Sequence, residues 1–117
     1  MTTTQLSPDT YDGTYRVPDL EGIRGRVKLV GPITTRYLVI DDGRVTVTPE
    51  QGPADCTITA FEPFDQVRVI NGELNLVTSL LQGRIEADGD PMLLVKIAGS
   101  MPEIGRQQMR SNKQDRS

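Results

Sequence analysis

The sequence predicts an α+β fold, in which helices cover one face of a mostly antiparallel, mixed sheet. Apolar and polar residues alternate along five short segments, as they do in strands with one buried face: residues 22–31, 35–41, 44–49, 54–60 and 84–88. From residue 61 onward, apolar residues instead recur at helical spacing. Because most strands precede the helices along the chain, we expect the helices to pack together on one sheet face.

The connections between these segments predict how the strands pair. Asp42-Gly43 lies between two alternating apolar runs, which is a strong signal for a tight hairpin. The other early connections are also short, and parallel neighbours usually need a long crossover. We therefore expect the first four strands to form an antiparallel meander, and residues 84–88 to add a fifth strand.

Three helices are expected, over residues 61–71, 74–82 and 91–98. Asn71-Gly72 and Gly83 are suited to close the first two, because glycine readily adopts the left-handed conformation at a helix end. Asp90 can cap the third helix, with Pro91 at its first position. The Met101-Pro102 pair is expected to end the ordered part of the chain.

The 117 residues fit one domain with two polar ends. Residues 1–21 contain Pro8, Gly13 and Pro18 and no helical period, so we expect a flexible N-terminal arm. Residues 22–102 should form the domain. Residues 103–117 carry four basic side chains and are expected to form a disordered basic tail.

Composition argues against several classes of function. The net charge is −3, from 13 basic and 16 acidic residues, which gives no footprint for nucleic acid. With no His and one Cys, neither a metal site nor a bound cofactor is expected. No apolar run is long enough to span a membrane, and no signal peptide is recognisable, so we expect a cytoplasmic protein.

Several pieces of the chain together resemble the sterol carrier protein type-two family, across residues 22–101. They are GIRGRVKLVGP, GRVTVTP, ADCTIT, NGELN and LLQGRIEADGD, followed by a very apolar helix. The resemblance implies a five-stranded mixed sheet, with a hydrophobic tunnel between sheet and helices that binds sterols, fatty acids or acyl-CoA. The family's N-terminal helix has no counterpart here, so part of the sheet should be uncovered or covered by a second copy. Similar stand-alone proteins occur in bacteria.

The expected function is therefore binding or transfer of a hydrophobic small molecule, such as a sterol, fatty acid, acyl-CoA or polyketide-like ligand. Each buried methylene contributes about 0.8 kcal/mol, so an acyl chain can bind without any special motif. An empty void of about 300 Å³ would cost about 7 kcal/mol, so we expect the protein without its ligand to be partly collapsed or to carry an adventitious ligand. Seventeen apolar residues are candidate ligand contacts, although core packing is the simpler interpretation for those outside the last helix: Leu38, Ile40, Val45, Val47, Cys56, Ile58, Phe64, Val67, Leu76, Leu80, Leu81, Ile85, Met92, Leu93, Val95, Ile97 and Met101. Residues 91–98 should form the movable side.

Two alternatives remain open. The same pocket could belong to a small biosynthetic enzyme, a cyclase or pericyclase that holds a folded substrate in a reactive conformation. Tyr37 and Arg68 would then be the hydrogen-bond donors, while Asp65 lies one helical turn from Arg68 and more simply forms a surface ion pair. The second alternative is a dimeric assembly module.

Overall fold

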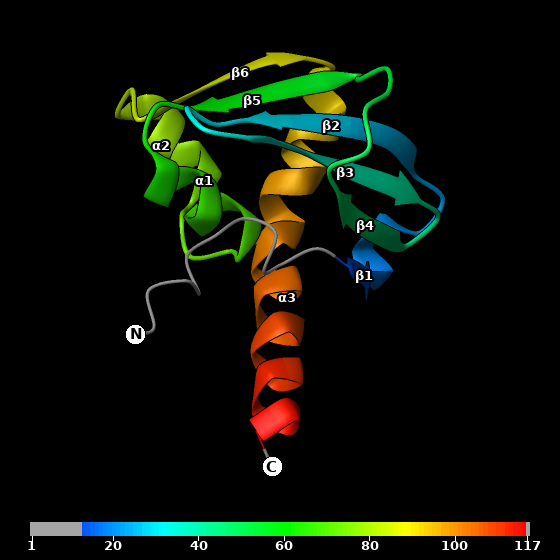
Figure 1. Cartoon of the computed structure of the whole chain (residues 1–117). Helices are drawn as coiled ribbons and strands as arrows, with labels where there is room; N and C mark the ends of the chain where they lie inside the picture. The colour runs from blue at the N-terminus through cyan, green and yellow to red at the C-terminus, as the bar shows by residue number, and fades with distance from the viewer. Residues whose placement is uncertain (1–12, 117) are drawn as a thin grey trace.

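The computed structural model describes the backbone of residues 13–116 and the side chains of residues 13–107. Its strands are β1 (Gly13–Arg16), β2 (Arg24–Val30), β3 (Thr35–Asp41), β4 (Arg44–Thr48), β5 (Cys56–Ala60) and β6 (Ile85–Gly89). Its helices are the 3-10 turn η3 (Pro18–Leu20), α1 (Pro63–Ile70), α2 (Leu76–Leu81) and α3 (Pro91–Arg116). The α+β class is confirmed, with six strands rather than five, and the helices lie on one side of the sheet (Figure 1).

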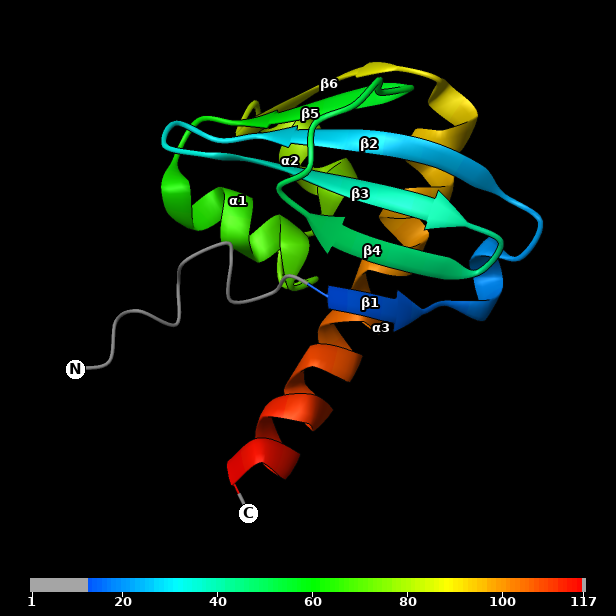
Figure 2. The same cartoon turned by 45° about the vertical axis from the view of Figure 1, so that its right-hand side comes forward.

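The strands form one mixed sheet in the order β1-β4-β3-β2-β5-β6. The β3–β4 hairpin is as predicted, because Asp42 (φ 52°) and Gly43 (φ 87°) both adopt the left-handed conformation that a two-residue turn requires. The predicted meander is wrong at β5, which pairs parallel with β2 instead of lying beside β4. The intervening loop crosses the outer face of the sheet (Figure 2).

Arg26 explains how so short a loop can make that crossing. Its backbone carbonyl accepts from Asp55 N (2.8 Å), and its amide donates to Asp55 Oδ2 (2.9 Å). Its guanidinium Nη2 also donates to the carbonyl of Glu50 (3.1 Å). These bonds link both ends of the loop to the middle of β2, which places β5 on the far side of β2 from β3.

Regular structure begins earlier than the sequence predicted. The expected arm contains β1, which pairs antiparallel with β4, and η3, which is followed by β2. Val17 and Leu20 beside these elements are fully buried in the same core as Val45 and Val47. A strand of four residues with an almost uniformly exposed pattern carries no alternation that could have predicted it. Residues 1–12 of the expected arm lie outside the described residues.

The last helix is much longer than predicted. It does not end at residue 98, and Pro102 lies inside it. A proline removes one backbone hydrogen bond, but buried side chains on both sides of it, Met101 and Ile104, keep the helix against the core. The disordered tail predicted for residues 103–117 is therefore helical as far as Arg116, and the side chains of residues 108–117 lie outside the described set.

The extension of α3 covers the part of the sheet that was expected to be open. Ile104 is buried in one cluster with residues of β4 and η3, and Gln107 exchanges two hydrogen bonds with the backbone of Arg16 in β1. The inner sheet face therefore needs no second copy to cover it here. No helix within residues 13–116 is long and apolar enough to cross a bilayer.

An apolar pocket between α2, α3 and β6 as candidate site

An apolar pocket lies where α2 and α3 approach the inner face of β5 and β6. Its volume is about 90 Å³. Every residue that lines it is apolar: Ile58, Leu76, Val77, Leu80, Ile85, Ala87, Leu94, Val95 and Ala98. Such a lining offers dispersion contacts and exclusion from water but no charged or hydrogen-bonding side chain, which suits the hydrocarbon part of a ligand.

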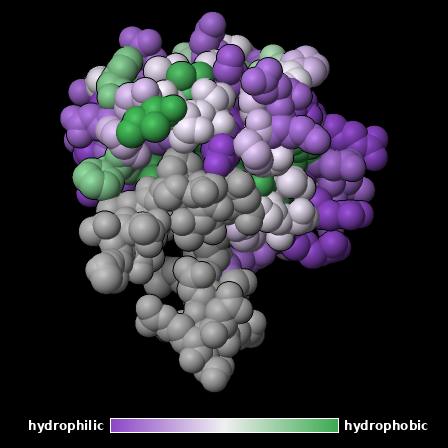
Figure 3. Space-filling view, in the orientation of Figure 1, coloured by the Kyte–Doolittle hydropathy of each residue, from purple (hydrophilic) through white to green (hydrophobic). Residues whose placement is uncertain are grey.

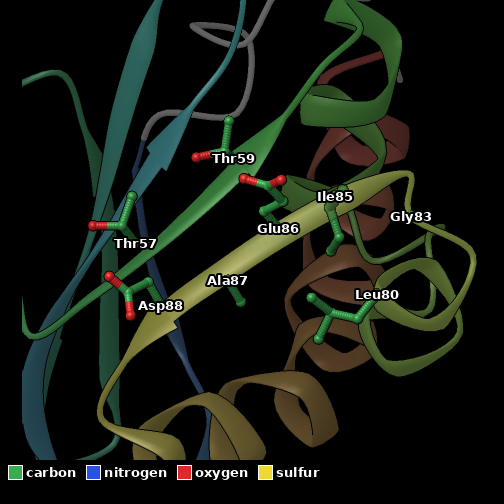
Figure 4. Close-up of a pocket in the computed structure, with 8 residues that line it drawn as sticks. All are labelled: Thr57, Thr59, Leu80, Gly83, Ile85, Glu86, Ala87 and Asp88. Atoms are coloured by element: carbon green, nitrogen blue, oxygen red, sulfur yellow. The ribbon is translucent and has the colours of Figure 1, made fainter.

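Alternation along β6 makes one wall of this pocket. Ile85 and Ala87 point toward the helices, whereas Glu86 and Asp88 point to the opposite side (Figure 4). Thr57 and Thr59 of β5 lie beside the two carboxylates along a broad open groove of about 640 Å³, whose lining also includes Leu80, Ile85 and Ala87 (Figure 4). The edge strand therefore carries apolar side chains toward the helices and acidic ones toward the other side, and Leu80, Ile85 and Ala87 line both hollows.

The pocket opens to solvent along the helices. Val77, Leu80 and Val95 line it and are nevertheless exposed, Val95 by 69%. Exposed apolar side chains around a concave apolar site typically mark a binding surface. The tunnel that the family resemblance implies stays a prediction, since the pocket seen here is smaller and open on one side.

Five of the predicted ligand contacts line the pocket: Ile58, Leu76, Leu80, Ile85 and Val95. Sequence reasoning missed Val77, Ala87, Leu94 and Ala98. The two alanines matter most, because their small side chains leave space between larger neighbours. A small residue on an apolar face was the signal that could have found them.

The other predicted contacts lie elsewhere. One group is buried in the core away from the pocket lining: Leu38, Ile40, Val45, Val47, Cys56, Val67, Leu93, Ile97 and Met101. The other group, Phe64, Leu81 and Met92, is exposed and also outside the lining. For both groups, contact with a ligand stays a prediction.

The three polar candidates do not meet in the pocket. Tyr37 lies on the face of β3 that points away from the helices, and the guanidinium of Arg26 lies 5.4 Å from the centroid of its ring. Asp65 is buried, and its Oδ1 accepts from Arg84 Nη2 (2.9 Å) and Arg68 Nη1 (3.5 Å). The predicted pair of Asp65 with Arg68 exists, but its carboxylate is buried and shared with Arg84.

Cys56 faces the core at the first position of β5. Its Sγ donates to the carbonyl oxygen of Asp90 (3.2 Å), and burial raises the pKa of the thiol above its ordinary value. A neutral, buried thiol is a poor nucleophile. Its place in the structure is that of a core residue, as the sequence predicted.

The fold, a mixed sheet with helices on one face beside an apolar pocket, matches a known class of lipid-associated domain. The model of the SCP-2 sterol transfer family matches residues 5–101, so the chain belongs to that family. No curated protein matches the sequence itself.

Solved structures give the same fold at low sequence identity. The stereoselective inverting sec-alkylsulfatase Pisa1 from Pseudomonas sp. is similar with a TM-score of 0.57 and 23% identity, over 73% of this chain but only 14% of the sulfatase. A ubiquinone synthesis protein, UbiJ-SCP2, is similar with a TM-score of 0.53 and 20% sequence identity, over 86% of this chain and 84% of that protein. A crystal structure of sterol carrier protein 2 is similar with a TM-score of 0.53 and 18% sequence identity, over 77% of this chain and 79% of that protein.

Proposed function

We propose that this protein binds the hydrocarbon part of a lipid-like molecule in the pocket between α2, α3 and β6, and transfers it. One observation carries the proposal, namely that all nine lining residues are apolar. Membership of a sterol transfer family supports the same class of ligand. A cytoplasmic location and a homodimer remain predictions.

The size of the pocket favours a flexible chain over a rigid ring system. A cavity of about 90 Å³ has room for only a few methylenes, so most of a ligand requires the pocket to widen. A linear chain can enter stepwise, and each methylene that leaves water contributes about 0.8 kcal/mol toward the widening. Sterol rings would need the whole space at once.

The enzyme alternative has less support in this geometry. A cyclase needs a donor or charge placed at the reacting atoms, and the lining side chains include neither. Tyr37 lies on the sheet face that points away from the pocket, while Arg68 forms an ion pair with Asp65. Binding of an apolar ligand requires no such group.

The proposal is tested by filling the pocket. Ala98→Leu and Ala87→Leu place larger side chains at the two small lining positions, and we expect each to weaken binding of dodecanoate by about tenfold or more. Isothermal titration and the ligand-induced rise in melting temperature would both report the change. Ala54→Leu is the matched control, since Ala54 is exposed in the β4–β5 loop.

Two results would contradict the proposal. One is a wild-type protein whose melting temperature is unaffected by saturated acids of any chain length. The other is equal binding by the wild type and both filled variants, with the fold of the variants verified by circular dichroism. The latter result would place the ligand elsewhere.

A further inference from the structure

We propose that the free edge of β6 binds an extended segment of a partner protein, in which basic and apolar residues alternate. The segment adds to the sheet as a further strand beside β6. This inference goes beyond the proposed function and does not rest on it, because it uses the backbone and the carboxylates of β6 and needs no lipid ligand.

The hydrogen bonding of β6 shows which of its backbone groups face the edge. β6 is the last strand of the sheet and pairs with β5. The amide of Asp90, just after β6, donates to the carbonyl oxygen of Asp55 (3.1 Å), which continues the register of the two strands by one residue. Hydrogen-bonded and non-hydrogen-bonded pairs alternate along an antiparallel ladder. Counting back from Asp90 by every second residue, Asp88 and Glu86 therefore direct their backbone groups to β5.

The remaining backbone groups of β6 are available to a partner. The N–H and C=O groups of Ile85, Ala87 and Gly89 point away from β5, and no element in the described part of the chain lies beyond them (Figures 1 and 2). The opposite edge of the sheet is closed, because the side-chain amide of Gln107 exchanges hydrogen bonds with the N–H (3.1 Å) and the carbonyl oxygen of Arg16 in β1. A row of unpaired strand groups such as that of β6 is a template for pairing with another chain.

An open groove of about 640 Å³ follows the free edge and touches both faces of β6. The threonines and carboxylates of β5 and β6 line it on the outer face, and Leu80, Ile85 and Ala87 line it on the helix side (Figure 4). Figure 3 shows hydrophilic and hydrophobic side chains side by side at the top of the molecule, where β6 lies in Figure 1. Successive side chains of a strand point to opposite faces. The groove therefore suits a segment in which polar and apolar residues alternate.

Two carboxylates determine the charge of the polar residues that fit. Glu86 and Asp88 are exposed, and neither forms an ion pair with another residue in the described part of the chain. Lys28 of β2 lies in the same row as Asp88, but β5 stands between them. Arg84, which precedes β6, contacts Asp65 at 2.9 Å. Opposite charges on neighbouring strands stabilise the pairing, so lysine or arginine suits the outer positions of the added strand.

The same carboxylates argue against antiparallel pairing of β6 with the β6 of a second copy. In the register centred on Ala87, Glu86 of one copy faces Asp88 of the other, and in the two neighbouring registers each carboxylate faces its own counterpart. These positions belong to the non-hydrogen-bonded pairs, in which side chains approach most closely. Like charges that face each other there are destabilising. The edge therefore favours a basic partner over a second copy.

Synthetic peptides test the pattern of the partner. The labelled peptide Lys-Val-Lys-Val-Lys-Val-Lys should bind the full chain, as measured by fluorescence anisotropy. A peptide of the same composition, with its lysines grouped before its valines, has the same charge without the alternation and should bind about tenfold more weakly or less. Replacing every lysine of the alternating peptide by glutamate should abolish binding.

Charge reversal tests the two carboxylates. Glu86→Lys combined with Asp88→Lys should weaken binding of the alternating peptide by about tenfold or more. Glu21→Lys combined with Glu73→Lys is the matched control, because it changes the net charge equally at two exposed positions outside the groove. The control should change the affinity by less than about twofold. Circular dichroism and the melting temperature verify that both variants fold.

N-methylation of single peptide amides tests whether the segment pairs as a strand. A methyl group on an amide that faces β6 blocks the ladder, whereas one on the neighbouring residue faces solvent. Methylation of the central Val or of the Lys beside it should therefore abolish binding in one case and leave it nearly unchanged in the other. The Val amide faces β6 if the peptide pairs antiparallel, and the Lys amide does if it pairs parallel.

Four results would overturn the proposal. They are no binding of the alternating peptide, equal binding of the alternating and grouped peptides, undiminished binding by the variant with both carboxylates reversed, and equal effects of the two N-methyl groups. The second would reduce the interaction to net charge, and the last would place the peptide away from the backbone of β6.

Discussion

The two helices that line the pocket are held in the fold very differently. α3 buries a continuous stripe of four side chains, Leu93, Ile97, Met101 and Ile104, against the sheet and η3. α2 is only six residues long and buries just Leu76 and Ser79. Since buried apolar contacts largely determine how easily a segment opens locally, the wall made by α2 should yield to a ligand before the wall made by α3.

Backbone contacts reinforce the difference. A Cβ at Gly105 of α3 would overlap the carbonyl oxygen of Asn71, and one at Gly72 would lie 2.5 Å from the carbonyl oxygen of Met101. α3 therefore touches the end of α1 with no side chain between them. The sequence predicted residues 91–98 as the movable side of the pocket. That assignment stays a prediction; because α2 buries fewer side chains, we propose that α2 also moves.

The largest effect should come from the buried stripe of α3. Ile97→Ala removes a fully buried side chain and should lower the free energy of unfolding by about 3 kcal/mol. Val77→Ala in α2 removes an exposed one and should cost less than about 0.5 kcal/mol. Urea denaturation of the two variants measures both; equal costs would refute the asymmetry.

A second, smaller effect should come from the glycine contact. Gly105→Ala must push α3 away from Asn71 and should cost about 2 kcal/mol. Gly99→Ala is the matched control in the same helix, since its Cβ would meet nothing within 4 Å. That change should stabilise the protein by about 0.5–1 kcal/mol through helix propensity. Thermal unfolding shifts of opposite sign would confirm the close contact, and shifts of the same sign would contradict it.

These long-range contacts explain which parts of the fold the sequence predicted. The β3–β4 hairpin depends on two adjacent residues, Asp42 and Gly43, so local chemistry was sufficient. The helix beyond Pro102 depends on Ile104, which is buried in the same core cluster as Val17 and Leu20, two residues of a segment with no periodic pattern. The position of β5 depends on hydrogen bonds between Arg26 and Asp55, two residues that nothing in their local sequence relates.

The candidate site divides in the same way. Large apolar residues such as Leu80 and Ile85 could be selected from their pattern, because they must face the helices or the sheet. The space itself could not be predicted, since its lining combines Ala87 and Ala98 from two different elements with larger side chains. The presence of the pocket depends on where small residues lie in the folded structure, which their sequence positions alone do not reveal.

A third prediction concerns how each helix begins. Asn75 caps α2, with its Oδ1 accepting from Thr78 N (2.9 Å), and Asp90 caps α3 by accepting from Met92 N (3.0 Å). Either change to Ala should cost about 1 kcal/mol of helix stability. In α2 the loss should open the whole helix, and hydrogen exchange of residues 78–82 should become about fivefold faster. In α3 only the first turn should respond, so faster exchange throughout α3 in Asp90→Ala would contradict the comparison.

The smallest effect is a dependence of stability on pH at the beginning of α3. Burial raises the pKa of the Cys56 thiol above its ordinary value of 9.0, while its hydrogen bond to the Asp90 carbonyl acts in the opposite direction. The folded state therefore favours the neutral thiol. Its contribution to stability is complete below the ordinary thiol pKa and is lost as the pH rises through the raised folded value. Between neutral pH and about pH 10, the melting temperature of the wild type should fall slightly more than that of Cys56→Ser, whose hydroxyl does not titrate in this range. Identical profiles would mean that water reaches Cys56, and that the first turn of α3 opens as readily as α2.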